Sequence, residues 1–216
     1  MLSQAVQDYV KVIYKFQEFG LVTTTEIAKE LNVSGASVTG MLKRLSTMGL
    51  VIYNSYKGVK LSDAGTKVAL EIIRFHRLLE TYLKEMLGFS LDKVHEEACR
   101  LEHFISSEFI EKITEQLGDP KFDPHGHPIP SKDGEFPDIN EILLINAENQ
   151  SEYTISRLND DDPKLLNYLE KSNLMPNAKI FTLENEPLNG IITIRLNNIE
   201  KVLGYNIASN IYVKTI

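Results

Sequence analysis

The chain has few of the features that mark secreted or membrane proteins. Its single cysteine, Cys99, excludes an internal disulfide among its 216 residues. It contains no apolar run of membrane length and no secretory signal with basic, apolar and small residues in order. With 43% hydrophobic and 25% charged residues, it has the composition of a globular protein, and its length favours more than one domain. We therefore expect a cytoplasmic protein that is neither secreted nor bound to a membrane.

Positive charge is scarce overall but not in the first third of the chain. The formal net charge is -7, which by itself argues against a nucleic-acid partner. Residues 1–66 nevertheless carry 7 Lys/Arg against 5 Asp/Glu, whereas residues 67–150 carry 9 against 17 and residues 151–216 carry 7 against 8. Any contact with nucleic acid is therefore expected in the N-terminal third.

The N-terminal third has the spacing of a helix-turn-helix. Apolar residues at helical spacing predict a first helix over residues 6–16. Thr24 or Thr25 is expected to cap a short second helix. After a tight turn, Ser34 is expected to cap a third helix that ends at Gly49. A short helix, a turn and a second helix in this order form the DNA-binding motif.

A hairpin and a set of small polar and basic residues extend this interpretation. Residues 50–53 and 59–61 flank a glycine-containing turn and predict two strands that form a wing. Small polar residues lead the third helix and basic ones follow, which suits a helix whose first turn enters the major groove. The residues expected at DNA are Ser34, Ala36, Ser37, Thr39, Lys43, Lys57 and Lys60. The alternative is a protein-interaction module, since a fold alone does not fix the function.

The stretch of residues 95–103 gathers several side chains that can bind metal. Residues three or four apart on a helix share a face. The expected stripe of nitrogen, sulfur and oxygen donors consists of His95, Cys99, Glu102 and His103. His76 and Glu80, four residues apart, form a second donor pair on an upstream helix. The simpler alternative is a set of exposed polar residues beside a small core cysteine. A zinc-protease helix is discounted, because it needs a second histidine where Cys99 stands.

The acidic middle of the chain is expected to be helical and to pair with a second copy. A long helix opens at Asp63 and continues to Leu83, and another follows Gly88. The apolar positions exceed what one small domain needs, which favours a homodimer with recognition helices about one DNA turn apart. Segment 118–137 is rich in Pro, Gly and Asp without periodicity, and is interpreted as a linker.

The last part of the chain predicts a small β-barrel. Short apolar segments alternate with turns, and a short helix over residues 165–171 interrupts them. The strands are expected at residues 142–145, 153–155, 178–181, 191–194 and 211–213. The expected fold class is therefore mainly α with a small β domain. Its domains are a winged helix-turn-helix at 1–66, a helical metal-binding and dimerisation domain at 67–138, and the barrel at 139–216.

Five motifs taken together are highly specific. They are Asp8-Tyr9, Ser34-Gly35-Ala36-Ser37-Val38, His76-Arg77-Leu78-Leu79-Glu80, residues 93–103, and His125-Gly126-His127-Pro128-Ile129-Pro130. With them, nearly the whole chain resembles the diphtheria toxin repressor family of metal-dependent transcriptional regulators, which has iron-dependent and manganese-dependent branches. Its last domain is similar to the small barrel of the Src-homology type that ends long members. The resemblance implies a homodimeric, metal-activated repressor that binds double-stranded operator DNA.

The resemblance also implies two groups of metal ligands. The activating group is implied at Asp8, Cys99, Glu102 and His103. The second group is implied at His76, Glu80 and His95, joined by His125 and by an acid among Asp160 to Asp162, for which we take Asp160. Asp123 and His127 replace residues that help to hold an anion in some members, so the resemblance does not extend to an anion there.

The donors leave both Mn(II) and Fe(II) open, and we favour manganese. The iron branch has Met where this chain has Asp8, whereas the manganese branch has an acid where this chain has Cys99. Carboxylate oxygen suits Mn(II), and thiolate favours Fe(II), Co(II) or Zn(II), so Zn(II), Co(II) and Cd(II) are expected substitutes. Lys11 departs from manganese members that carry a carboxylate at that position and bind paired metal ions.

A metal-dependent enzyme or a metal-storage protein is the alternative to a regulator. Such an enzyme needs an open coordination position, a base beside it and a substrate cleft. The sequence nominates no separate base or nucleophile. We therefore predict a regulator of metal homeostasis that is not an enzyme and has no small-molecule substrate.

Overall fold

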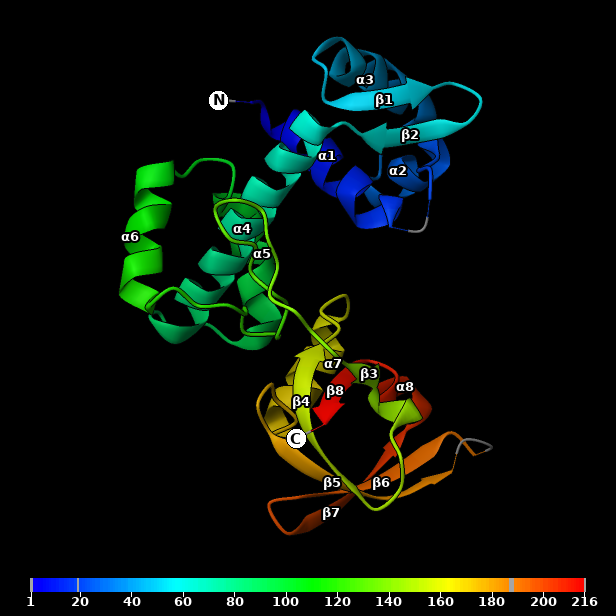
Figure 1. Cartoon of the computed structure of the whole chain (residues 1–216), viewed down its shortest axis with the longest axis vertical. Coiled ribbons are helices and arrows are strands. Elements are labelled where there is room, and N and C mark those ends of the chain that lie inside the picture. Colours follow the sequence, from blue (N-terminus) through cyan, green and yellow to red (C-terminus); the bar gives the residue numbers. More distant parts are fainter. Residues whose placement is uncertain (1, 19, 187–188, 216) are drawn as a thin grey trace. The chain divides into compact units, whose positions relative to one another are not determined.

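The computed structural model describes residues 2–18, 20–186 and 189–215 (Figure 1). The chain divides into two compact units. The first comprises Met1–His76, Arg100–Ser107 and Pro130–Glu135, and the second comprises Arg77–Cys99, Glu108–Ile129 and Phe136–Ile216. Helix α4 (Asp63–Glu85) contributes residues to both units. Two short segments from the middle of the sequence therefore return to the N-terminal unit.

The first unit contains the winged helix-turn-helix that the sequence predicts. Helices α1 (Gln4–Gln17), α2 (Thr24–Glu30) and α3 (Gly35–Thr47) precede the antiparallel strands β1 (Val51–Asn54) and β2 (Gly58–Leu61) (Figure 1). Apolar side chains from all five elements meet in one core, which includes Val10, Ile13, Ile27, Val38, Leu42, Val51 and Val59. Burial of these side chains is the main force that holds the three helices and the wing together.

The second helix is capped one or two residues earlier than the sequence predicts. Its N-cap is Thr23, in an extended conformation, and not Thr24 or Thr25. The amide of Glu26 donates to Oγ1 of Thr23 over 3.2 Å, while the amide and hydroxyl of Thr23 each donate to the Glu26 carboxylate over 2.7 Å. The bond from the Thr23 backbone, followed by that from its hydroxyl, lowers the pKa of Glu26. Only Thr23 has a glutamate three residues later, as this capping box requires. The third helix is capped by Ser34, as predicted.

Helix α4 begins in close contact with the wing. The hydroxyl of Ser62 donates to the carbonyl oxygen of Gly49 over 2.6 Å, and its amide donates to that of Leu50 over 3.0 Å. A Cβ atom at Gly65 would lie 2.0 Å from the carbonyl oxygen of Leu50. Glycine is therefore needed at this position for the long helix to leave the wing where it does.

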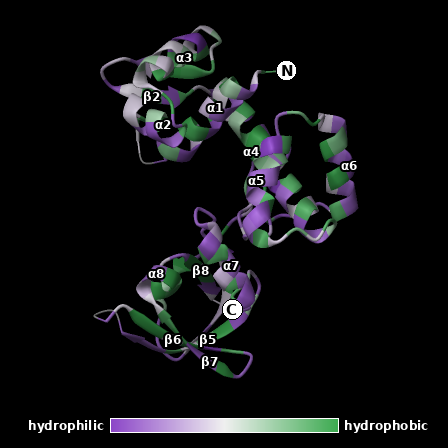
Figure 2. Cartoon of the chain, turned by 180° about the vertical axis from the view of Figure 1, so that it is seen from behind, coloured by the Kyte–Doolittle hydropathy of each residue, from purple (hydrophilic) through white to green (hydrophobic). Residues whose placement is uncertain are grey.

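Most of α5 (Leu91–Leu101) and α6 (Ser107–Leu117) belongs to the second unit. Helix α5 follows Gly88, as predicted, whereas α6 was not predicted. The buried residues of α6 are Ile110 and Ile113, and the helix shows hydrophobic and hydrophilic residues side by side in Figure 2. Their spacing of three residues was the available signal for an amphipathic helix.

The interpretation of segment 118–137 as a linker is wrong for residues 122–130, which are packed. Oδ1 of Asp123 accepts the amides of His125 and His127 over 2.8 and 3.0 Å, and Phe122 bridges to Pro128. The Asp123 side chain and that of His125 are buried. An Asx-type turn organises this loop from within, which apolar periodicity does not reveal.

The C-terminal part of the second unit is the small β domain. Its sheet is antiparallel, in the order β3-β8-β4-β5-β6-β7. The strands are β3 (Ile142–Leu143), β4 (Ser151–Leu158), β5 (Lys179–Glu186), β6 (Ile191–Leu196), β7 (Ile199–Gly204) and β8 (Ile211–Thr215). The helices are a 3-10 turn at Leu144–Asn146, α7 (Pro163–Lys171) and α8 (Tyr205–Ala208). The predicted fold class, mainly α with a small β domain, is confirmed.

Three details of this domain differ from the prediction. Strand β7 and helix α8 were not predicted, and the segment predicted as a strand over 142–145 becomes a 3-10 turn at Leu144. In β7 the exposed residues include Ile199 and Val202, so the strand lacks the alternation of a half-buried one. Asp162 caps α7 by accepting the amide of Lys164 over 2.9 Å, as predicted for the acidic turn. Across the described ranges of the chain, the helices are too short or too polar to cross a bilayer.

Thr23→Ala should lower the free energy of unfolding of the winged unit by about 1 kcal/mol, because it removes the side-chain half of the capping box. Thr25→Ala, in the same helix, should leave stability equal or slightly higher, since alanine is the better helix former. Urea denaturation followed by circular dichroism measures both. An equal loss in the two variants would show that Thr23 is not the cap.

Candidate metal centres and DNA-binding surface

Three donor side chains converge in the first unit. Asp8 lies on α1, whereas Glu102 and His103 lie in the turn after α5. Nε2 of His103 is 3.1 Å from Oδ1 of Asp8 and 3.5 Å from Oε1 of Glu102. Glu102 and His103 are buried. The three ligand atoms lie within 4.8 Å of one another, so a single metal ion can reach all of them.

Gln7 determines which nitrogen of His103 faces the carboxylates. Oε1 of Gln7, which can only accept, is 2.6 Å from Nδ1 of His103, so Nδ1 carries the ring proton. Nε2 of a neutral ring then presents its lone pair to the oxygens of Asp8 and Glu102. Electron-pair donors this close are stabilised by a proton or a metal ion between them. The donor set therefore fits a divalent cation, with Gln7 in the orienting position that metal-binding histidines commonly have.

Glu102 makes the most polar contacts in this group. Nζ of Lys11 is 2.9 Å from each of its oxygens, and Nδ1 of His76 is 2.5 Å from Oε2. Burial by itself raises the pKa of Glu102, but His76 and Lys11 outweigh burial and hold that pKa below its ordinary value. At Asp8, burial outweighs the contact with His103 and raises the pKa. A cation that binds here therefore meets an ionised Glu102.

The predicted single stripe of donors over residues 95–103 is wrong, because α5 ends at Leu101. Glu102 and His103 leave the helix and belong to the first unit, while His95 and Cys99 remain in the second. There, Sγ of Cys99 is 3.6 Å from Nε2 of His95. The shared face of residues three or four apart exists only while the helix continues.

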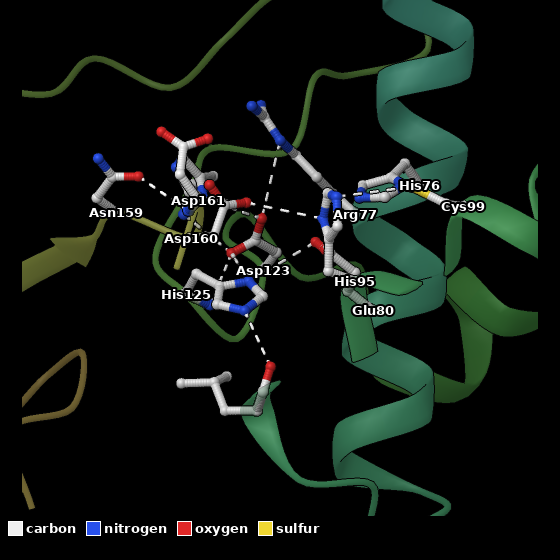
Figure 3. A network of polar contacts seen from close by, with 12 residues as sticks. His76, Arg77, Glu80, His95, Cys99, Asp123, His125, Asn159, Asp160 and Asp161 are labelled. Atoms are coloured by element: carbon white, nitrogen blue, oxygen red, sulfur yellow. Dashed lines mark hydrogen bonds and ion pairs between the residues drawn. The ribbon is translucent and has the colours of Figure 1, made fainter. Parts of the chain in front are cut away.

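A second group of donors lies in the second unit, around the loop that carries Asp123 and His125 (Figure 3). Nδ1 of His95 is 3.1 Å from Oε1 of Glu80 and 3.9 Å from Oδ2 of Asp160. Nδ1 of His125 is 3.8 Å from Oε2 of Glu80. Glu80, His125 and Asp160 offer ligand atoms within 4.8 Å of one another. This group also has the spacing of a metal site.

Two buried atoms of the second group have no hydrogen-bond partner within the described part of the chain, namely Nδ1 of His125 and Oδ2 of Asp123. Nε2 of His125 donates to the carbonyl oxygen of Leu91 over 3.4 Å, which leaves Nδ1 as a lone-pair donor. Burial raises the pKa of Asp160, but His127 and His125 hold it below its ordinary value. Oδ2 of Asp123 lies 3.8 Å from Nε of Arg77 and 3.5 Å from Nδ1 of His127, so its charge is partly compensated. A buried polar atom without a hydrogen bond is costly, and Nδ1 of His125 is therefore the atom that best fits a cation.

His76 and the loop residues make contacts that the sequence did not predict. His76, which the sequence groups with Glu80 and His95, also contacts Glu102 in the first unit. Asp123, His125 and His127 form a further trio of donors within 4.8 Å. Sequence reasoning did not identify Gln7 as a functional residue, and it noted Lys11 only as a departure from the family. The available signal was their position beside Asp8 and one turn after it on the same helix.

The residues expected at DNA lie on the surface of the winged unit, with one exception. Exposed side chains are Ser34, Ala36, Ser37, Lys43, Lys57 and Lys60. Thr39 is half-buried, and its hydroxyl donates to the carbonyl oxygen of Gly35 over 2.9 Å. The hydroxyl of Ser37, in the exposed first turn of α3, lies 2.9 Å from that of Ser34.

A winged helix-turn-helix together with buried donor sets for metal defines a class of metal-binding proteins with a DNA-binding domain. Family models match in the same order along the chain. "Iron dependent repressor, N-terminal DNA binding domain" covers residues 1–59, "Iron dependent repressor, metal binding and dimerisation domain" covers 62–131, and "FeoA domain" covers 142–215.

Individual proteins agree with these matches. An uncharacterised HTH-type transcriptional regulator of Methanocaldococcus jannaschii is 38% identical over 52% of this chain and 91% of its own length. The iron-dependent repressor IdeR of Mycobacterium leprae is 28% identical over 89% of each chain. The chain belongs to the iron-dependent repressor family, whose members are metal-dependent transcriptional repressors and include the diphtheria toxin repressor.

Solved structures show the same fold. A manganese-dependent transcriptional repressor in complex with manganese superimposes with a TM-score of 0.86 and 33% identity, over 98% of this chain and 100% of that one. ScaR with bound Zn2+ gives a TM-score of 0.78 and 33% identity, over 98% and 99%. ScaR has also been solved with Cd2+.

The lowered pKa of Glu102 predicts acid sensitivity of the metal-free protein. A carboxyl whose pKa is lower in the folded state stabilises the fold above its unfolded value, and that stabilisation is lost as pH falls through the folded value. The free energy of unfolding should therefore fall below about pH 4.5, and Glu102→Gln should remove part of this dependence. Urea denaturation between about pH 3 and pH 7 measures it. Glu115→Gln, which changes an exposed pair with Lys112, serves as control. An unaltered pH profile in Glu102→Gln would contradict the assignment.

Proposed function

We propose that this protein is a metal-activated repressor of genes for metal homeostasis, which binds double-stranded operator DNA as a homodimer in the cytoplasm. The observation that carries the proposal is the trio of Asp8, Glu102 and His103. Asp8 belongs to the first helix of the DNA-binding domain, whereas the other two follow α5 of the metal-binding domain. A ligand held by all three joins the DNA-binding helices to the rest of the first unit.

Cys99 stays a predicted metal ligand on the strength of the family resemblance alone. The ion, when bound, supplies positive charge that the three donors cannot balance among themselves. Gln7 holds the His103 ring with Nε2 toward the site, and Glu102 is ionised before the ion arrives. The second proposed site uses Glu80, His95, His125 and Asp160, whose ligand atoms come from α4, α5, the packed loop and the turn before α7.

Exposed apolar side chains support the homodimer. In the first unit Leu101 and Phe104 are exposed, the latter by 76%, and in the second unit Met86, Leu87 and Phe109 are exposed. The family model that covers all of them is described as a metal binding and dimerisation domain. Large exposed apolar side chains of this kind mark interaction surfaces. We propose that these side chains contact their counterparts in a second copy of the chain, in line with the apolar excess of the sequence. We also keep the proposed division into three domains, with boundaries at residues 66 and 138.

Manganese is the proposed activator, with iron as the alternative. The trio in the first unit consists of two carboxylates and one imidazole, which suit Mn(II) as well as Fe(II). Cys99 is the softer donor and favours Fe(II), Co(II) or Zn(II) if its thiolate binds. A structural neighbour is named as manganese-dependent and a relative as iron-dependent. No catalytic step is proposed, in keeping with a family of repressors.

Metal should strengthen operator binding by wild-type protein by about 5- to 150-fold, the usual range of allosteric coupling. His103→Ala and Asp8→Ala should lose this gain and remain folded dimers, while Asp133→Ala, an exposed carboxylate of the same unit, should keep it. Operator affinity is titrated separately with Mn(II) and with anaerobic Fe(II). Full metal dependence in His103→Ala would refute the site. Activation by Fe(II) but not by Mn(II) at cellular concentrations would refute manganese as the activator, while the proposed function as a repressor would stand.

The wing is expected to contact phosphates through Lys57 and Lys60. Each lysine that contacts a phosphate contributes about 0.9 to the log-log slope of affinity against salt. Lys57→Ala combined with Lys60→Ala should therefore flatten the slope, whereas Lys179→Ala combined with Lys214→Ala, exposed in the C-terminal domain, should not. Fluorescence anisotropy at several salt concentrations gives the slopes. An unchanged salt slope in the Lys57 and Lys60 double variant would show that the wing does not contact DNA phosphates.

A further inference from the structure

Lys11 is bound as a cation inside the donor set of the first unit. It lies on α1, three residues after Asp8, and its Nζ is 2.9 Å from both oxygens of Glu102 and 3.2 Å from Nδ1 of His76. Its side chain is 26% exposed, and that of Glu102 is 2% exposed. Lys15, one turn later, makes an ordinary surface pair with Glu30 at 3.1 Å, with side chains 54% and 37% exposed. The two lysines share a helix but not an environment.

Glu102 is shared between Lys11 and the proposed metal ligands. Its Oε1 is 2.9 Å from Nζ of Lys11 and 3.5 Å from Nε2 of His103. A buried carboxylate is stable only when its charge is compensated, and Lys11 supplies that compensation at both oxygens. An ion that binds through Oε1 therefore approaches a carboxylate whose charge is already neutralised.

The charge of the donor set follows from the same contacts. Asp8 and Glu102, when ionised, contribute two negative charges, and Lys11 removes one of them. Electrostatic attraction for a divalent ion is correspondingly weaker. The ammonium and the ion also repel each other across Glu102, in a partly buried setting where charges are poorly screened.

Position on α1 gives Lys11 a structural part as well. Both Lys11 and Asp8 extend from this helix toward the turn at Glu102 and His103. Without metal, the ion pair of Lys11 with Glu102 is the charged contact that ties α1 to this turn, alongside the Asp8 contact with His103. Lys11 therefore contacts this turn through its own charge, whereas Asp8 is proposed to contact it through a metal ion.

We propose that Lys11 is a built-in cation that weakens metal binding at Asp8, Glu102 and His103, and thereby sets the metal concentration at which the protein responds. This inference rests on the proposed metal site. It makes Lys11 a determinant of affinity and not a ligand. A charge fixed by the chain lets the protein keep its buried carboxylate ionised and still release metal when the supply falls.

The test is the dissociation constant of Mn(II) for purified metal-free protein, measured by competition with a chromophoric chelator. Lys11→Gln, which keeps hydrogen-bonding capacity without the charge, should bind Mn(II) about 10-fold or more tightly than wild type, because one repulsive charge is removed. Lys15→Gln is the matched control and should keep the wild-type constant. Lys11→Arg keeps the charge and should stay close to wild type. If Lys11→Gln does not fold, Lys11→Met, of similar length, takes its place.

His103→Ala in the same assay separates the two proposals. The Mn(II)-binding step at the proposed site is the step that His103→Ala should remove. If His103→Ala binds Mn(II) as wild type does, the proposed metal site is refuted. If His103→Ala loses the step but Lys11→Gln leaves the constant unchanged or weakens it, the role of Lys11 is refuted while the site stands. Equal tightening in Lys11→Gln and Lys15→Gln would show a general effect of net charge and would also refute it.

Discussion

The buried carboxylate of Glu102 is the constraint on which the first unit depends. A charge removed from water must be compensated at close range, and here Lys11 from α1 and His76 from α4 both approach it. These elements are remote in the sequence. Because one side chain needs both of them, the first helix of the DNA-binding domain is fixed relative to the turn that carries the metal donors.

In the second donor group, a loop provides the groups that compensate the buried carboxylate charges. Asp123 uses one oxygen to accept the amides of its own loop, which places His125 beside Glu80. Its other oxygen makes no hydrogen bond in the described part of the chain but lies within ion-pair distance of Arg77 and His127. Asp160 approaches from the turn before α7. Several histidines and acids thus share one buried region, and the histidines lower the pKa of Asp160 against the effect of burial. Both groups keep oxygen donors charged in the interior, as a metal site requires.

Much of the fold followed from local patterns. Helical periodicity located α1, α3, α4 and α5, and the turn between apolar segments located the wing. The features that the sequence analysis missed also have local explanations. The cap at Thr23 needed the capping box to be recognised, α6 carries only two buried residues, and β7 exposes Ile199 and Val202. A strand without alternation gives no signal of its own, since its partner in the sheet supplies the pairing.

The sequence by itself determined which residue types the protein uses for metal and DNA, because donor chemistry, spacing and charge are written in it. Tertiary structure alone decided how the donors are grouped. Helix α5 ends at Leu101, so Glu102 and His103 join Asp8 while His95 faces Glu80. The tertiary structure also showed that Lys11, which departs from the family pattern, is the ion-pair partner of Glu102. The reason is physical: a helix end and the burial of a charge depend on what packs around them, and periodicity along the chain does not record it.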